Sequence, residues 1–354
     1  MKIVTVFITG PGSGLALPSP APRPSPVPAV KGSPTMRIRP TSRPLRAGLL
    51  SAALLGVALA AGACSSSGSG SAASVSGAGG KIDAVGAENE YADVISQIGG
   101  QYVDASAIMS NPNTDPHTFE ASPQVAAEVS GAQLIVQNGV GYDDFMSKIE
   151  QADASSSRKV IDVQTLLGLP DSTPNPHLWY KPTTMPAVAA AVASDLESLQ
   201  PSHAAYFKAN LATFDHALAT YNSAIASLKS TYAGDAVATT EPVADYLLEA
   251  AGIDNLTPWS FQAAIMNGTD PSPQDVATEK SLFTEHKVKA FVYNQQVTDS
   301  LTQSLLTLAH QNDIPVVGVY ETMPTPGYDY QKWMLAEVSA LSNAFGAGTS
   351  APTL

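Results

Sequence analysis

The sequence predicts an α/β fold of two lobes, each with a mostly parallel sheet, joined by one long rigid helix. From residue 81 onward, short apolar runs alternate with amphipathic helical patterns, which is typical of parallel α/β units. Residues 184–229 contain no glycine and keep apolar residues at helical spacing, and the segments on both sides have a similar order of elements. Ligands of open α/β sheets bind beyond the carboxyl ends of the strands, so a two-lobed protein offers a cleft between its lobes as a site.

The first lobe contains several short elements that end at glycine. Gly99-Gly100 closes the first helical pattern, and Asn138-Gly139 closes a strand. The apolar runs predict strands over 81–85, 102–109, 134–137 and 159–163. The helical patterns predict helices over 88–98, 123–129 and 142–150.

The long helix is interrupted only at Pro186 and at Gln200-Pro201-Ser202. Proline lacks the N–H group that a continuous helix needs, and Ser202 is a natural N-cap for a restarted helix. We expect the helix to be kinked or broken at Pro201.

The α/β pattern returns after Gly234 and forms the second lobe. Its apolar runs predict strands over 235–240, 288–293 and 314–320, and its helical patterns predict helices over 243–251, 302–311 and 331–345.

The first 63 residues have the composition of a targeting segment. They contain no Asp or Glu but seven basic residues, and four arginines after Met36 precede the uncharged run 47–63. This order of basic, apolar and small residues predicts a secretory signal, and Met36 is a better start for it than Met1.

Cys64 is the only cysteine, so the chain has neither an internal disulfide nor a thiolate zinc cage. The segment Ala61-Gly62-Ala63-Cys64 precedes a Ser/Gly-rich linker and resembles the lipobox of bacterial lipoproteins, although Ala61 replaces the usual Leu. The resemblance implies that Cys64 is acylated and becomes the mature N-terminus. An ordinary buried cysteine and a short transmembrane anchor are the alternatives.

These observations divide the 354 residues, which are enough for two ordinary domains, into six segments. The segments are the extension and signal 1–63, the lipidated Cys and linker 64–80, the N-terminal lobe 81–182, the connecting helix 183–230, the C-terminal lobe 231–345 and the tail 346–354.

The chain is acidic, with 31 acidic and 18 basic residues and a formal net charge of −13. Removing the seven basic residues of the signal leaves 11 basic and 31 acidic residues, a net charge of −20. This charge argues against nucleic-acid binding, which requires a basic surface.

Two of the six histidines stand out. His117 and His177 each follow a proline in a rigid loop, NPNTDPHTFEASP and TPNPHLWYKP, near the edge of an element. Each could also be a simple Pro-His turn. The other histidines lie in polar, helix-like surroundings and are expected at the surface: His203, His216, His286 and His310.

Two carboxylates end apolar strands of the second lobe. Glu241 follows DAVATT and Glu321 follows IPVVGVY. An unpaired buried charge is costly, so such carboxylates should be exposed, neutralised or coordinated. Together with His117 and His177 they make up an N₂O₂ shell suited to a divalent metal ion.

The segments DPHTFEASP, LIVQNGVGYDDFM, NPHLWYKP and TTEPVADYL resemble the metal-binding solute receptors of bacterial ABC transporters, over roughly residues 81–345. The resemblance implies two lobes joined by one long rigid helix, with a zinc or manganese ion in the cleft between them. His117 and His177 match the first and second metal ligands and Glu241 the third. Glu321 takes the fourth position, which is usually Asp.

The resemblance implies a receptor that captures manganese or zinc, or iron, and delivers it to an ABC permease. Glutamate at the third position hardens the site and favours Mn²⁺ or Fe²⁺ in ligand type, although the raw affinity for zinc usually exceeds that for manganese. We expect a monomer held by its lipid at the outer face of the cytoplasmic membrane, with small local rearrangements on loading. Affinity should fall as the histidines become protonated.

Two other classes of protein remain open. Two His and two carboxylates also suit a lipid-anchored metallohydrolase, which needs an open coordination position and a general base. No carboxylate stands out as that base, although Asp115 and Glu120 flank His117. A surface adhesin without a metal is the third class, and the paired DPH and NPH loops argue against it.

Overall fold

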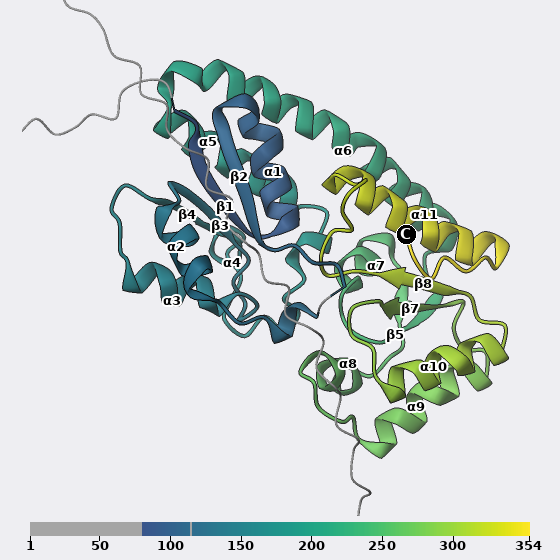
Figure 1. Ribbon diagram of the computed structural model, residues 1–354. Helices are drawn as coiled ribbons and strands as arrows, with labels where there is room; N and C mark the ends of the chain where they lie inside the picture. Colours follow the sequence, from purple (N-terminus) through teal and green to yellow (C-terminus); the bar gives the residue numbers. More distant parts are fainter. Residues whose placement is uncertain (1–79, 114) are drawn as a thin grey trace, which may run out of the picture. The chain divides into compact units, whose positions relative to one another are not determined.

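The computed structural model describes residues 80–113 and 115–354. The predicted signal and the predicted lipidation site Cys64 lie outside these residues. Within the described residues, the chain forms two four-stranded parallel sheets, each with helices packed on it (Figure 1). Together with the long helix α6, these sheets confirm the predicted fold class of two α/β lobes.

The first sheet has the strand order β2-β1-β3-β4, and every adjacent pair is parallel. Its central strand β1 is buried at six of its seven positions because helices cover both faces, as in other parallel sheets. Its strands are β1 (Ile82–Glu88), β2 (Val103–Met109), β3 (Leu134–Gln137) and β4 (Lys159–Asp162). Its helices are α1 (Asn89–Gly99), α2 (Pro123–Gly131), α3 (Asp144–Ala152) and α4 (Val163–Leu166).

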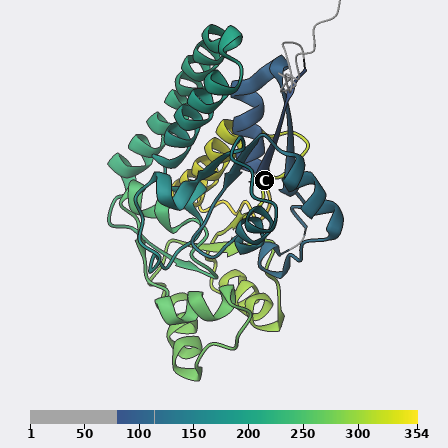
Figure 2. The same ribbon diagram turned by 90° about the vertical axis from the view of Figure 1, so that its left-hand side faces the viewer.

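The long helical segment is broken where the sequence predicts it. Helix α5 (Thr184–Leu199) ends at Gln200, a 3₁₀ turn spans Pro201–His203, and α6 (Ala204–Tyr232) continues for 29 residues. Helices α5 and α6 pack against each other, and α6 then runs past both sheets (Figures 1 and 2). It contacts α1 of the first lobe and α7 and α11 of the second.

The second sheet has the order β6-β5-β7-β8 and is also parallel throughout. Its strands are β5 (Ala236–Thr239), β6 (Asp254–Asn255), β7 (Ala290–Asn294) and β8 (Val316–Val319). Its helices are α7 (Asp245–Ala251), α8 (Trp259–Met266), α9 (Pro273–Thr284), α10 (Ser300–Gln311) and α11 (Tyr330–Ala347).

The sequence patterns did not predict β6, α4, α8 or α9, although α9 carries a start signal. Ser272 caps α9 by accepting a hydrogen bond from the Asp275 N–H, and Pro273 occupies the first helical position.

The last residues of the chain, predicted as a tail, also contact the second sheet. Helix α11 continues to Ala347, and Ala351 then pairs with Val317 at the edge of β8.

One hydrophobic core runs through both lobes. It includes Ile95 of α1, Phe214 of α6 and Trp333 of α11, which are almost completely buried. Because α6 and α11 share this core with both sheets, the two lobes are connected by packed side chains as well as by the chain itself. No helix in the described part of the chain is both long and apolar enough to cross a membrane.

Candidate metal centre

His117 lies in the loop after β2, in a single 3₁₀ turn over Pro116–Thr118. The Asp115 side chain caps this turn, since its Oδ1 accepts a hydrogen bond of 2.8 Å from the His117 N–H. The His117 side chain is 21% exposed, so it is the part of the site that solvent reaches.

His177 is completely buried, and Asn175 fixes its orientation. The Asn175 Oδ1 lies 2.8 Å from the imidazole Nδ1 and also accepts a hydrogen bond from the His177 N–H. Asn175 Nδ2 donates to the Pro242 carbonyl oxygen, which confirms that the amide oxygen is the atom facing the imidazole. With the Asn175 oxygen as its acceptor, Nδ1 carries a proton, and Nε2 is the nitrogen that faces the site.

Hydrogen bonds from the first lobe hold the loop that carries His177. Tyr91 on α1 donates a hydrogen bond of 2.7 Å to the Asn138 Oδ1, and Asn138 Nδ2 donates to the Pro176 carbonyl oxygen. Tyr180, three residues after His177, donates to the Tyr320 carbonyl oxygen in the second lobe at 2.8 Å. The His177 loop is thus bonded to both lobes.

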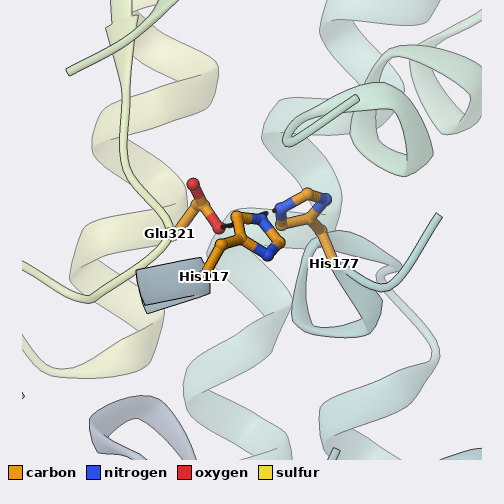
Figure 3. Close-up of side chains that lie close together, drawn as sticks. All are labelled: His117, His177 and Glu321. Atoms are coloured by element: carbon orange, nitrogen blue, oxygen red, sulfur yellow. Dashed lines mark hydrogen bonds and ion pairs between the residues drawn. The ribbon is translucent and has the colours of Figure 1, made fainter. Parts of the chain in front are cut away.

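Glu321 follows β8 and brings its carboxylate to both imidazoles (Figure 3). Its Oε2 lies 3.1 Å from His117 Nε2 and 3.1 Å from His177 Nε2, and it is completely buried. One ligand atom from each of these three residues lies within 4.8 Å of the others. Gln296 holds the backbone here, because its Oε1 accepts from the Glu321 N–H at 2.6 Å.

Tyr142 adds a hydroxyl group to the same carboxylate. Its phenolic O–H donates to the Glu321 Oε2 at 3.0 Å. Gly139, Val140 and Gly141 precede it with positive φ angles, a backbone that glycine adopts readily. This turn brings the tyrosine from the end of β3 to the centre.

Glu241 lies beside the group but is not part of it. It follows β5, is 2% exposed, and its Oε1 accepts a hydrogen bond of 3.1 Å from Asn294 Nδ2. Asn294 Nδ2 also donates to the Glu321 Oε1 at 2.7 Å. The structure therefore brings together three of the four predicted ligands and links the fourth to them through an amide.

The ionisation of these residues depends on burial and on their mutual contacts. Burial would raise the pKa of Glu321, but hydrogen bonds from His117 and His177 outweigh it and hold the pKa well below its usual range. Burial would lower the pKa of His117, yet the hydrogen bond and charge of Glu321 raise it. Complete burial keeps the pKa of His177 below its usual value. Burial is the main reason why the pKa of Glu241 is raised, and the negative charge of Glu321 raises it further.

Two imidazole nitrogens and a carboxylate oxygen suit a divalent transition metal such as zinc, manganese or iron. A cation and a proton compete for the same imidazole nitrogen, because only the neutral ring has a free lone pair there. Binding of a metal ion at this site would therefore displace protons from the imidazole nitrogens that face it.

The other histidines lie apart from this group. His203 is half-buried and stacks on Tyr102, with ring centroids 3.7 Å apart, while His216, His286 and His310 are exposed.

Four residues of the site were not predicted from the sequence: Asn175, Tyr142, Asn294 and Gln296. Asn175 was recognisable as part of the NPH loop, whereas Asn294 lies one residue beyond a predicted strand and carries no signal of its own.

Comparison with known proteins identifies the family. The family model of zinc-uptake complex component A, periplasmic, matches residues 85–344. The chain is 24% identical over 257 residues to the metal ABC transporter substrate-binding lipoprotein FimA of Streptococcus parasanguinis, which covers 69% of this chain and 81% of that protein.

Solved structures share the fold. The periplasmic zinc-binding protein TroA from Treponema pallidum has a TM-score of 0.64 at 17% identity, over 76% of this chain and 100% of that one. FpvC from Pseudomonas aeruginosa, solved in complex with Mn²⁺, has a TM-score of 0.63 at 17% identity, over 75% and 99% of the two chains. Since the family model covers well over half of its length, this chain belongs to the family of zinc-uptake complex component A, the metal-binding substrate-binding proteins of ABC metal transporters.

Proposed function

We propose that this protein captures a divalent transition metal ion outside the cytoplasm and delivers it to the membrane permease of an ABC importer, without catalysing a reaction. The observation that carries the proposal is the convergence of His117, His177 and Glu321 from two lobes on one buried point. Such a set of nitrogen and oxygen ligands is of the type that binds divalent transition metals.

The metal would bridge the lobes. His117 and His177 belong to the first lobe and Glu321 to the second, and we propose that Glu241 of the second lobe also binds the ion. The continuous core around α6 opposes a wide closure of the lobes. The His117 side chain is the part of the site that solvent reaches, so loading and release would proceed by local movement of its loop.

The proposed cargo is manganese or zinc, with iron as a further candidate. The family model is named for zinc uptake, and FpvC has been solved with Mn²⁺. Two carboxylates beside two imidazoles favour Mn²⁺ in ligand type, whereas the general order of affinities favours zinc. Availability of the metal outside the cell would then decide which ion is carried.

The proposed location follows from the N-terminal segment. A lipid on Cys64 would hold the receptor at the outer face of the cytoplasmic membrane, and the Ser/Gly-rich linker would let the monomeric receptor reach its permease. The relative FimA is named a lipoprotein, which supports this arrangement.

Calorimetric titration of the purified protein with Mn²⁺, Zn²⁺ and Fe²⁺ tests the proposal. We expect one ion per chain, and a loss of affinity of at least about tenfold in His117→Ala and in Glu321→Ala. His216→Ala, which removes an exposed histidine from α6, is the matched control and should bind like the wild type. Binding that is unchanged in both site variants would show that the metal site is elsewhere.

A further inference from the structure

Asn294 lies between two carboxylates at the carboxyl ends of the strands of the second sheet. It is the last residue of β7, the strand that lies between β5 and β8. Glu241 follows β5 and Glu321 follows β8, so the three side chains lie at the carboxyl ends of adjacent parallel strands. All three are almost completely buried.

The contacts of Asn294 fix which way its amide points. Its Oδ1 accepts a hydrogen bond of 3.0 Å from the Gln296 N–H, so the oxygen faces its own loop. Its Nδ2 therefore faces the site, where it donates to the Oε1 of Glu241 at 3.1 Å and to the Oε1 of Glu321 at 2.7 Å. The Asn294 N–H donates to the Thr240 hydroxyl oxygen, which holds the backbone in place as well.

One amino group thus donates to one oxygen of each carboxylate, and the other oxygen of each does not contact it. The remaining oxygen of Glu321 faces His117 and His177 and also accepts a hydrogen bond from Tyr142. The remaining oxygen of Glu241 is buried and has no hydrogen-bond partner among the described residues. A buried carboxylate oxygen without a partner is costly, and a cation shared with Glu321 would satisfy it.

We propose that Asn294 is a positioning residue that presents Glu241 and Glu321 together, so that Glu241 completes the shell of the same cation. This inference rests on the proposed function, since it concerns the same metal ion. Without the bridging amide, the two like-charged carboxylates would separate and Glu241 would turn away from the ion. Asn294 itself donates hydrogen bonds and does not bind the metal.

A double-mutant cycle measures whether Asn294 acts through Glu241. Mn²⁺ affinity is determined by calorimetry for the wild type, Asn294→Ala, Glu241→Ala and the double variant. We expect each single variant to lose about tenfold or more in affinity, and the double variant to lose clearly less than the product of the two single losses. A combined loss equal to that product would overturn the inference.

Co²⁺ absorption provides a readout that a purely structural role would not change. The intensity of the visible bands reports the coordination of the ion, so Asn294→Ala and Glu241→Ala should give the same altered spectrum. A wild-type spectrum for Asn294→Ala would overturn the inference. If Asn294→Ala does not fold, Asn294→Ser is measured in both assays with the same expectations, since one hydroxyl group cannot bridge two carboxylates.

Asn255→Ala is the matched control. Asn255 ends β6, the edge strand of the same sheet, and its Nδ2 also donates to a carboxylate, that of Asp245, but this carboxylate is not part of the site. We expect its affinity and spectrum to match the wild type, and equal effects of Asn255→Ala and Asn294→Ala would overturn the inference. A wild type that binds none of Mn²⁺, Zn²⁺, Fe²⁺ and Co²⁺ would overturn the proposed function and this inference with it. Normal binding that is lost in His117→Ala but unchanged in Asn294→Ala would overturn only the inference.

Discussion

The Asn175 side-chain oxygen lies 2.8 Å from Nδ1 of His177, and the amino group of the same side chain donates to the Pro242 carbonyl oxygen. One asparagine thereby orients the buried imidazole of the first lobe and ties its loop to the segment that carries Glu241. Partners of this kind commonly set the affinity of a metal site, because they fix the ring and the tautomer before the ion arrives.

Asn175→Ala is expected to lower metal affinity by about 10- to 100-fold, since the imidazole loses its orienting acceptor. Asn175→Asp keeps an acceptor for Nδ1 and should retain more affinity than Asn175→Ala. Calorimetric titration measures both variants. Asn267→Ala, at an exposed asparagine, should bind normally, and an Asn175→Ala variant that also did so would contradict the orienting role.

Metal affinity should fall as the pH is lowered. His117 must be neutral to bind an ion, and because the hydrogen bond and charge of Glu321 raise its pKa despite burial, protons compete with the ion at a higher pH than they would at a free imidazole. We expect a loss that approaches about tenfold per pH unit for each proton displaced. Titrations from about pH 8 to about pH 5.5 measure the slope. The slope should be shallower in His117→Ala, and an equal slope would mean that another group titrates.

Glu337→Gln is expected to stabilise the protein in alkaline solution. Burial raises the pKa of Glu337 to about 8, although Tyr180 and Trp333 donate hydrogen bonds to its carboxylate. In the unfolded state Glu337 loses its proton above a pKa of 4.5, whereas in the folded state it keeps the proton up to a pKa of about 8. The free energy of unfolding therefore falls as the pH rises from 4.5 toward 8.

Urea unfolding measures this effect at several pH values. The wild type should lose stability relative to Glu337→Gln by on the order of 1 kcal/mol per pH unit within that window. Glu128→Gln, at an exposed position on α2, should follow the wild type at every pH. A constant difference between Glu337→Gln and the wild type would exclude titration of Glu337 as the cause.

Asn89→Ala is expected to weaken both the fold and the site. Asn89 Nδ2 donates to the Met323 carbonyl oxygen at 2.8 Å, and its Oδ1 accepts from the Met323 N–H at 3.0 Å. Met323 lies two residues after Glu321, so this pair holds the Glu321 segment against α1. Loss of both bonds should cost about 2 kcal/mol of stability and reduce metal affinity.

Gln97→Ala is the matched control for Asn89. Gln97 and Gln331 exchange two amide hydrogen bonds between the same two parts of the molecule, but farther along α1 from Glu321. Its loss should lower the melting temperature while metal affinity stays unchanged. Reduced affinity in Gln97→Ala would show that metal affinity depends on contacts between the lobes in general, and that the contact of Asn89 with Met323 has no special role.

Cys64→Ser should release the protein from the membrane fraction of the cell. A thioether-linked lipid forms only on the cysteine sulfur, so the variant cannot be acylated at this residue. Fractionation followed by immunoblotting measures the location of the protein. Membrane association that persists in Cys64→Ser would favour anchoring by the apolar run 47–63 itself.

The sequence by itself determined the elements and the residue types of the site. Alternating apolar runs and helical patterns are local signals, and they predicted both parallel sheets and the break at Pro201. The prolines before His117 and His177 marked two rigid loops, and the ends of apolar strands marked Glu241 and Glu321. The sequence did not predict α8 and α9, which lie between strands and carry only weak periodicity.

The tertiary structure alone decided which of these residues meet. Glu321 reaches both imidazoles across a sequence separation of 144 residues from His177, while Glu241 is held one amide away by Asn294. No spacing along the chain encodes that difference, because it depends on how β5, β7 and β8 are ordered in the sheet and how the lobes pack around α6. Local patterns fix what each segment forms, and the distances between ligand atoms arise only when the shared core brings the segments together.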